Sequence, residues 1–274
     1  MSENNSELLQ SGSIPSDSKY IPLRISEVIS RSINLFGKNL VLLLTISSIV
    51  YIPITIITII SKLQWQSTIL VNFITSWFVS ILALGALVWA ISQLYLQGKP
   101  GIYGSFQAIA KRYGSVWLAS AITNSITIIP SYFINGLTAY YKEYPFCLCG
   151  FIIIYIPLIF YIFPRLISVT PSILIEKLGP IQGIKRSWSL SSGNYWRIIC
   201  VLLITSLLFG VILVFPIMVL TAGLKLFIAN AIIVSEIITT CITIIAIPLS
   251  ACMNVVLFYD LRSNNRNNDI ASIS

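Results

Sequence analysis

Histidine is absent from this 274-residue chain, and charged residues are scarce, at 9% of positions with only nine acids. Without histidine there is no Ser-His-Asp triad, no imidazole base and no His-ligated zinc. The acids lie mostly in the tails or at the ends of apolar runs, so no carboxylates are paired for acid–base chemistry. A Gly-x-x-x-x-Gly-Lys phosphate loop is also missing. We therefore expect neither an enzyme nor an ATP-driven motor, and no catalytic, metal-binding or cofactor-binding residue.

The scarcity of charge also argues against a water-soluble domain, in which about 25% of residues are charged. Apolar residues make up 56% of the chain, and a lipid-facing exterior accommodates them without polar cover. The net charge is +8, but the basic residues form short clusters between long apolar runs. That pattern is typical of contact with anionic headgroups. We expect membrane lipids at the cytoplasmic face and membrane proteins as partners, and no nucleic acid.

Six apolar runs are long enough to cross a bilayer, since a spanning helix needs about 20 apolar residues. They lie at approximately 39–61, 67–96, 115–140, 147–175, 195–223 and 227–259. Fourteen of the 17 Lys and Arg residues fall on one side of these runs, and only Lys62, Lys142 and Lys225 fall on the other. The positive-inside rule then predicts a multi-pass plasma-membrane protein with both termini in the cytoplasm.

The predicted organisation is a disordered cytoplasmic tail at 1–20, a polytopic helical membrane domain at 21–262 and a flexible cytoplasmic tail at 263–274. Within the domain, a basic amphipathic segment, a proline-bearing span, a loop and a long returning span recur three times. The basic segments lie at 25–32, 105–113 and 179–188. The first and third align without gaps at Arg31-Ser32 and Arg186-Ser187. We predict an all-α fold of three repeated hairpins, each preceded by an interfacial amphipathic helix.

Ionisable residues inside membrane segments are costly and suggest function. Arg165 follows Pro164 in the fourth span, where it either contacts a lipid phosphate or polar cavity, or extends to the inner headgroups. Glu176 is expected to pair with Arg186 or Arg197, and Asp260 to cap or pair with a basic interfacial helix. The candidate polar or lipid-headgroup contacts are Arg165, Glu176, Arg186, Arg197, Asp260 and Arg262.

Two of the five cysteines, Cys147 and Cys149, form a Cys-x-Cys near a loop and are able to pair or bind metal. The chain has no histidine and no second cysteine pair in a loop. Both absences argue against a metal site.

Three stretches resemble a known family. The segment from Glu176 to Arg197 is similar to E-G-x-G-P-x-x-A-x-x-R-S-W-x-L-x-x-G-x-x-W-R, and Leu257-Phe-Tyr-Asp-Leu-Arg262 is similar to a terminal L-Y-Y-D-L-R. Residues 22–31 also resemble the opening of that family, which is named for the membrane domain of glycerophosphoryl diester phosphodiesterases. The resemblance implies a stand-alone membrane module. It does not extend to the phosphodiesterase barrel, which needs histidines, and the tail after Arg262 departs from the family pattern.

Two functions remain open, and a third, a membrane enzyme of lipid metabolism that relies on the few Asp and Glu residues at the inner boundary, is disfavoured. The first is a non-catalytic membrane protein that organises lipids or partner proteins at the cytoplasmic membrane. The alternative is a transporter or permease for a small or lipid-like molecule, with proline-broken spans around a midplane site. A polar cavity around Arg165, Asn124 and Asn254 would favour the alternative.

Overall fold

The computed structural model describes residues 23–65, 74–140, 157–211, 215–216, 218–220, 223 and 231–271, and all regular structure in these ranges is helical. The predicted N-terminal tail and the Cys147-x-Cys149 motif lie outside the described residues. The helices are α2 (Ile25–Lys38), α3 (Leu40–Trp65), the π-helical turn η1 (Thr75–Val79), α5 (Ser80–Tyr95), α6 (Ile102–Ala110), α7 (Tyr113–Tyr140), α9 (Val169–Ile175), α10 (Pro180–Ser191), α11 (Tyr195–Phe209) and α13 (Ala231–Ala271).

The chain is a multi-pass helical membrane protein. Within the described ranges, three helices are long and apolar enough to cross a bilayer: Leu40–Gln64, Pro157–Ile175 and Ile233–Asn265. The pair Pro180–Ser191 and Tyr195–Leu207, bent by 97°, passes the same test together and makes a possible fourth span. Their outer faces expose large apolar side chains such as Val41 and Leu207. Hydrocarbon solvates such side chains, whereas water does not.

Helices α5, α9 and α13 form the centre of the molecule, where α5 contacts both α9 and α13. Helix α5 is the most enclosed of them, with Ala83, Ala86, Leu87 and Ile91 fully buried. Its Gly85 lies so close to α6 that a Cβ there would overlap the side chain of Ile109. The small residues of α5 therefore permit the close helix contact that membrane bundles favour.

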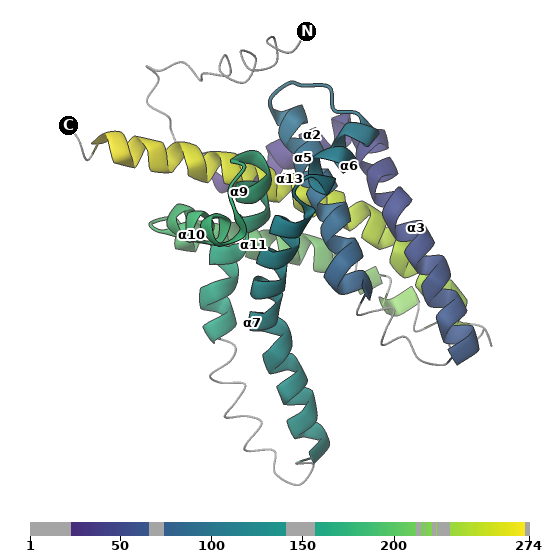
Figure 1. The fold of residues 1–274 in the computed structure, drawn as a ribbon. Helices are drawn as coiled ribbons and strands as arrows, with labels where there is room; N and C mark the ends of the chain where they lie inside the picture. Colours follow the sequence, from purple (N-terminus) through teal and green to yellow (C-terminus); the bar gives the residue numbers. More distant parts are fainter. Residues whose placement is uncertain are drawn as a thin grey trace.

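Helices α3 and α13 lie side by side along one edge of the molecule (Figure 1). At their far end Lys62 forms an ion pair with Glu236, and nearer the middle the hydroxyls of Thr55 and Thr240 hydrogen-bond at 2.6 Å. The last long helix is thus fastened along the first. Helix α13 also packs on α2, so the C-terminal part of the chain closes the bundle against its N-terminal part.

The junctions between each amphipathic helix and the next long helix are alike. Each amphipathic helix carries a fully buried serine seven residues before the position at which the chain bends. The serines are Ser32, Ser105 and Ser187, and the bend residues are Asn39, Arg112 and Asn194. Each bend amide donates to the carbonyl three residues earlier, at 3.2, 2.9 and 3.2 Å, and each bend carbonyl accepts from the amide four residues later, at 3.1, 3.1 and 3.0 Å. The same local hydrogen bonding therefore redirects the chain three times.

The amphipathic helices also pack in equivalent places. Helix α6 contacts α5, α10 contacts α9, and α2 contacts α13. The first two pairs are consecutive in the sequence, whereas the third joins its two ends. The N-caps of α2 and α10 share a further detail, because Glu27 accepts from the Arg24 amide at 3.0 Å and Gln182 accepts from the Gly179 amide at 3.3 Å. Each is one half of a capping box, in which the side chain of the third helical residue accepts from the N-cap amide.

The C-terminal tail carries regular structure. The sequence predicts flexible chain from residue 263, which stays a prediction, and α13 continues as helix to Ala271. Asn264 donates to the side-chain oxygen of Asn194 at 2.9 Å, and Asn265 donates to the Ser189 carbonyl at 3.2 Å. Both hydrogen bonds join the end of α13 to the end of α10 and the bend before α11. They give partners to asparagine side chains that the sequence predicts to be solvent-exposed, and so they favour helix beyond the apolar run.

Candidate functional site

Asp260 is the most deeply buried of the predicted site residues, with a fully enclosed carboxylate. Its Oδ1 accepts from the Leu23 amide at 3.0 Å, and its Oδ2 lies 2.5 Å from Nη2 of Arg197. Arg197 also donates to the Leu23 carbonyl. A buried carboxylate is tolerable only when paired in this way. The cluster ties the chain entering α2 to α11 and α13.

Glu176 forms a second cluster, where the chain turns from α9 towards α10. Arg186 approaches it with two nitrogens, Nε at 2.9 Å and Nη2 at 3.3 Å, and Nε of Arg262 lies 3.3 Å from the same carboxylate. Of the two partners expected for Glu176, Arg186 is confirmed, whereas Arg197 pairs with Asp260 instead. The sequence predicts that Asp260 caps or pairs with a basic interfacial helix. It accepts from the amide of Leu23, one residue before the N-cap of α2, whereas its ion-pair partner Arg197 belongs to α11.

Arg165 lies among aromatic rings. Its guanidinium carbon is 4.3 Å from the ring centroid of Tyr161, 4.5 Å from that of Trp188 and 5.8 Å from that of Tyr195. We call these three rings the aromatic cage. Cation–π attraction holds the guanidinium against the ring faces. The Nε atom of Arg165 is buried and has no hydrogen-bond partner among the described residues.

The position of the cage follows from an interruption of the fourth span. Pro164 has no N–H, so the Phe160 carbonyl lacks its usual partner four residues on. The Tyr195 hydroxyl donates to this carbonyl at 2.8 Å. The helix then turns at residues 167–168, and the Ser187 hydroxyl donates to the Arg165 carbonyl at 2.6 Å. Two carbonyls near the interruption thereby fix α10 and α11 beside Arg165.

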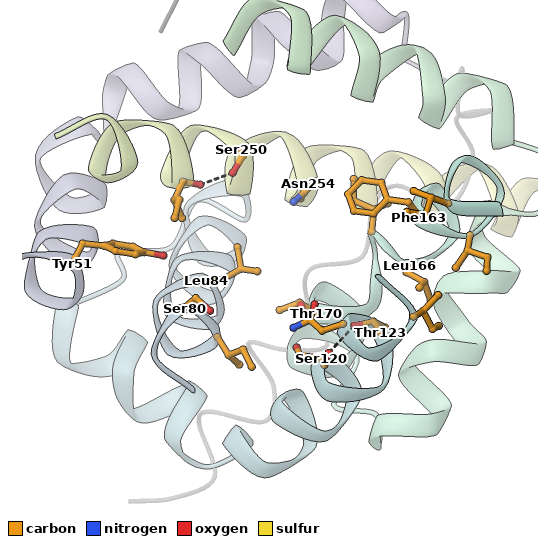
Figure 2. A pocket seen from close by; sticks show the side chains of 17 residues that line it. Tyr51, Ser80, Leu84, Ser120, Thr123, Phe163, Leu166, Thr170, Ser250 and Asn254 are labelled. Atoms are coloured by element: carbon orange, nitrogen blue, oxygen red, sulfur yellow. Dashed lines mark hydrogen bonds between the residues drawn. The ribbon is translucent and has the colours of Figure 1, made fainter. Parts of the chain in front are cut away.

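A cavity of about 450 Å³ lies between α3, α5, α7, α13 and the segment 157–175 (Figure 2). Its volume falls within the range of about 300–1,000 Å³ that is usual for small-molecule sites. None of the 17 described residues that line it is charged. The polar members carry hydroxyl or amide groups, and they are Tyr51, Ser80, Ser120, Thr123, Asn124, Thr170, Ser250 and Asn254.

Two of the predicted cavity residues are therefore present and one is not. Asn124 and Asn254 line the cavity, but Arg165 does not. Figure 2 shows Asn254 pointing into the open space from α13, and Tyr51 directing its hydroxyl towards it from α3. In the described part of the chain, no three His, Cys, Asp or Glu residues gather as metal ligands.

Sequence reasoning missed two sets of residues. No sequence motif around Tyr161 or Tyr195 predicts their contact with Arg165. Trp188, in contrast, lies in the Arg-Ser-Trp stretch that carries the family resemblance. The hydroxyl residues of the cavity are spread over several apolar runs. Hydroxyl residues on otherwise apolar helices suggest a polar site between the helices. The sequence does not show which of these residues face one another.

The comparisons with known proteins give one match. A family model described as "Membrane domain of glycerophosphoryl diester phosphodiesterase" matches residues 113–272, more than half of the chain. The matched region begins at the start of α7 and includes the Glu176 cluster, the aromatic cage, and Asp260 with Arg197, whereas Leu23 lies outside it. No curated protein and no solved structure matches the chain.

Proposed function

This chain belongs to the family described as the membrane domain of glycerophosphoryl diester phosphodiesterase, and from that premise we propose that it is a non-catalytic membrane module that organises lipids at the cytoplasmic face of the plasma membrane. In this proposal six spans form three repeated hairpins with both termini in the cytoplasm. The equivalent junctions and the equivalent packing of α2, α6 and α10 support the repeat. The 14-to-3 distribution of basic residues supports the orientation.

The observation that carries lipid binding is the state of Arg165. Among the four arginines predicted as headgroup contacts, Arg186, Arg197 and Arg262 form ion pairs with Glu176 or Asp260. Arg165 makes no ion pair with a described residue, and rings cover its guanidinium instead. A stacked guanidinium keeps its N–H edge available, and that planar edge suits a phosphate. Arg165 is thus the arginine best placed to hold a lipid phosphate.

The non-catalytic part of the proposal is supported by what the acids do. Glu176, Glu236 and Asp260 each hold a basic side chain, and Asp260 is fully buried. These acids therefore act as fastenings between helices.

The lipid-binding proposal is tested by native mass spectrometry of the purified protein with phosphatidylglycerol. We expect Arg165→Gln to weaken binding at least tenfold and Arg165→Lys to fall nearly as far, because an ammonium lacks the planar fork. Arg31→Gln is the matched control, since it removes the same charge from an exposed position on α2. Free inorganic phosphate serves as a competitor to separate recognition of the phosphate alone from recognition of the whole lipid. Unchanged phosphatidylglycerol binding by Arg165→Gln would refute the proposal.

The cavity favours a second candidate, a permease for a small or lipid-like molecule. Asn124 and Asn254 line a space between spans, and the fourth span is interrupted beside it at residues 167–168. Interrupted helices at midplane sites are common in transporters. Flux of a bound solute across proteoliposomes, abolished by Asn254→Leu, would support this candidate, and binding without flux would eliminate it. Membrane-protein partners remain a prediction that a cross-linking pull-down tests.

A further inference from the structure

The walls of the cavity contain no charged side chain that would pair with a charged ligand. All 17 lining residues are neutral, and the described ion pairs are formed by residues that do not line it. An unpaired charge within the membrane-spanning part of a protein is expensive. A phosphate or ammonium group would therefore enter at a cost that no lining side chain offsets. The electrostatics of the walls select an uncharged ligand.

Two of the hydroxyls on the walls have a preferred hydrogen-bonding direction. Ser250 donates to the Ile247 carbonyl at 2.8 Å, and Thr123 donates to the Ser120 carbonyl at 3.1 Å, as the dashed lines in Figure 2 show. A hydroxyl has a single proton to donate and two lone pairs. Because these protons are engaged within their own helices, both oxygens present acceptors. A ligand group that donates hydrogen bonds matches them.

The lining is entirely apolar along one segment and mixed elsewhere. The segment 157–166 contributes Ile159, Ile162, Phe163 and Leu166, all apolar, whereas α7 contributes Ser120, Thr123 and Asn124 together with Ile126. Figure 2 shows Phe163 and Leu166 on one side of the space, with Ser250 and Asn254 projecting from α13. A ligand with an apolar chain and a small polar end would match this division.

We infer that the cavity is a binding site for an uncharged amphiphile whose polar end carries hydroxyl donors. The observation that supports it is a neutral set of hydroxyl and amide side chains on α7 and α13, in which Thr123 and Ser250 present acceptor oxygens, together with the apolar residues of the segment 157–166. The inference uses the same cavity as the permease candidate, but it concerns binding and not translocation. It is independent of Arg165, which lies outside the cavity.

The test titrates the purified full-length protein with three probes that share one acyl chain. They are a long-chain monoacylglycerol, the matching lysophosphatidic acid, and the monoacylglycerol with both hydroxyls methylated. Native mass spectrometry measures the bound fraction. We expect saturable binding of the monoacylglycerol and at least tenfold weaker binding of the other two, since the first competitor adds a charge and the second removes the donors. Equal or tighter binding of either competitor would overturn the inference.

A pair of threonine variants locates the site. Thr123→Val removes an acceptor from the cavity, whereas Thr239→Val removes a hydroxyl that is bonded in the same way to Ser235 but lies on an exposed face of α13. We expect Thr123→Val to weaken monoacylglycerol binding about fivefold, as the loss of one neutral hydrogen bond implies. Thr239→Val should bind as the wild type does. Equal effects of the two substitutions would place the ligand elsewhere.

The outcome is separable from that of the other proposals. Arg165→Gln should leave monoacylglycerol binding unchanged even where it abolishes phosphatidylglycerol binding. Loss of both on that substitution would show a single shared site and refute the cavity as a separate one. Absence of flux in proteoliposomes with binding intact would eliminate the permease alone.

Discussion

At the scale of single residues, the scarce charges are mainly used to hold segments together. The Asp260 carboxylate reaches the Leu23 amide, 237 positions away in the sequence, and Arg197 contacts both residues. Glu176 likewise joins Arg186 and Arg262. In a low-dielectric interior such groups stabilise the fold only as a complete set, because each one left alone retains the cost of desolvation.

We predict that Asp260→Asn lowers the free energy of unfolding by about 3–5 kcal/mol, since it leaves Arg197 without its counter-charge in a buried position. Thermal unfolding in detergent measures the change. Lys62→Gln is the comparison, because the Lys62–Glu236 pair is partly exposed, and its loss should cost about 1 kcal/mol or less. The double variant Asp260→Leu with Arg197→Met should regain part of the loss. Wild-type stability of Asp260→Asn would show that the cluster does not stabilise the fold.

At the scale of helices, interruptions are repaired by side chains from the following unit. Tyr195 at the start of α11 donates to the Phe160 carbonyl, and Tyr113 at the start of α7 donates to the Phe78 carbonyl at 2.9 Å. Both bonds join residues 35 positions apart, and Phe78 lies in the π-helical turn η1. Irregular turns leave backbone groups to be satisfied within the membrane. The tyrosine hydroxyls donate hydrogen bonds to these carbonyls and position the helix to which each tyrosine belongs.

A double-mutant cycle tests this account. Tyr195→Phe should cost about 1 kcal/mol, the net value of a typical hydrogen bond, by leaving the Phe160 carbonyl unpaired. Pro164→Ala restores an N–H four residues after Phe160, so the hydroxyl should become dispensable in that background. The free energy of unfolding of the four proteins gives the coupling.

Tyr113→Phe is the control for this cycle. It should cost a similar amount, and Pro164→Ala should leave that cost unchanged, because Phe78 does not depend on Pro164. If the changes in the free energy of unfolding caused by Tyr195→Phe and Pro164→Ala simply added, the tyrosine hydroxyl would not compensate for the missing N–H of Pro164.

At the scale of the whole molecule, equivalent junctions recur three times and the last long helix closes on the first. Each buried serine is followed after eleven residues by a buried apolar residue, namely Leu43, Val116 and Ile198. Each amphipathic helix packs on one longer or more deeply placed helix: α6 packs on α5, α10 packs on α9, and α2 packs on α13. This contact between the two ends supports the proposal that both lie on the same side of the bilayer.

Cysteine labelling tests that orientation. In a variant with the five native cysteines replaced by serine, single cysteines are placed at Gln64, Lys111 or Lys185, all exposed. We expect a membrane-impermeant maleimide to label Gln64→Cys in intact cells, and Lys111→Cys and Lys185→Cys only after permeabilisation, because basic segments stay in the cytoplasm. The reverse pattern would invert the topology. Labelling of all three in intact cells would rule out a shared cytoplasmic side for the basic helices.

The sequence by itself determined the features that depend on local composition and period. Long apolar runs without charge specify membrane helices, and a proline or glycine marks where a helix bends or ends. The pairing of Glu176 with Arg186 was also predictable, because only ten positions and one turn separate them.

Only the tertiary structure decided which distant residues meet. Arg197 binds Asp260 rather than Glu176, Arg165 is held by aromatic rings rather than facing the cavity, and Ser250 and Thr123 share one space. The physical reason is that periodicity places a side chain on a face of its own helix, whereas its partner depends on the rotation and crossing of another helix. Those are set by close contacts such as Gly85 against Ile109, which appear in the sequence only as a small residue and a large one.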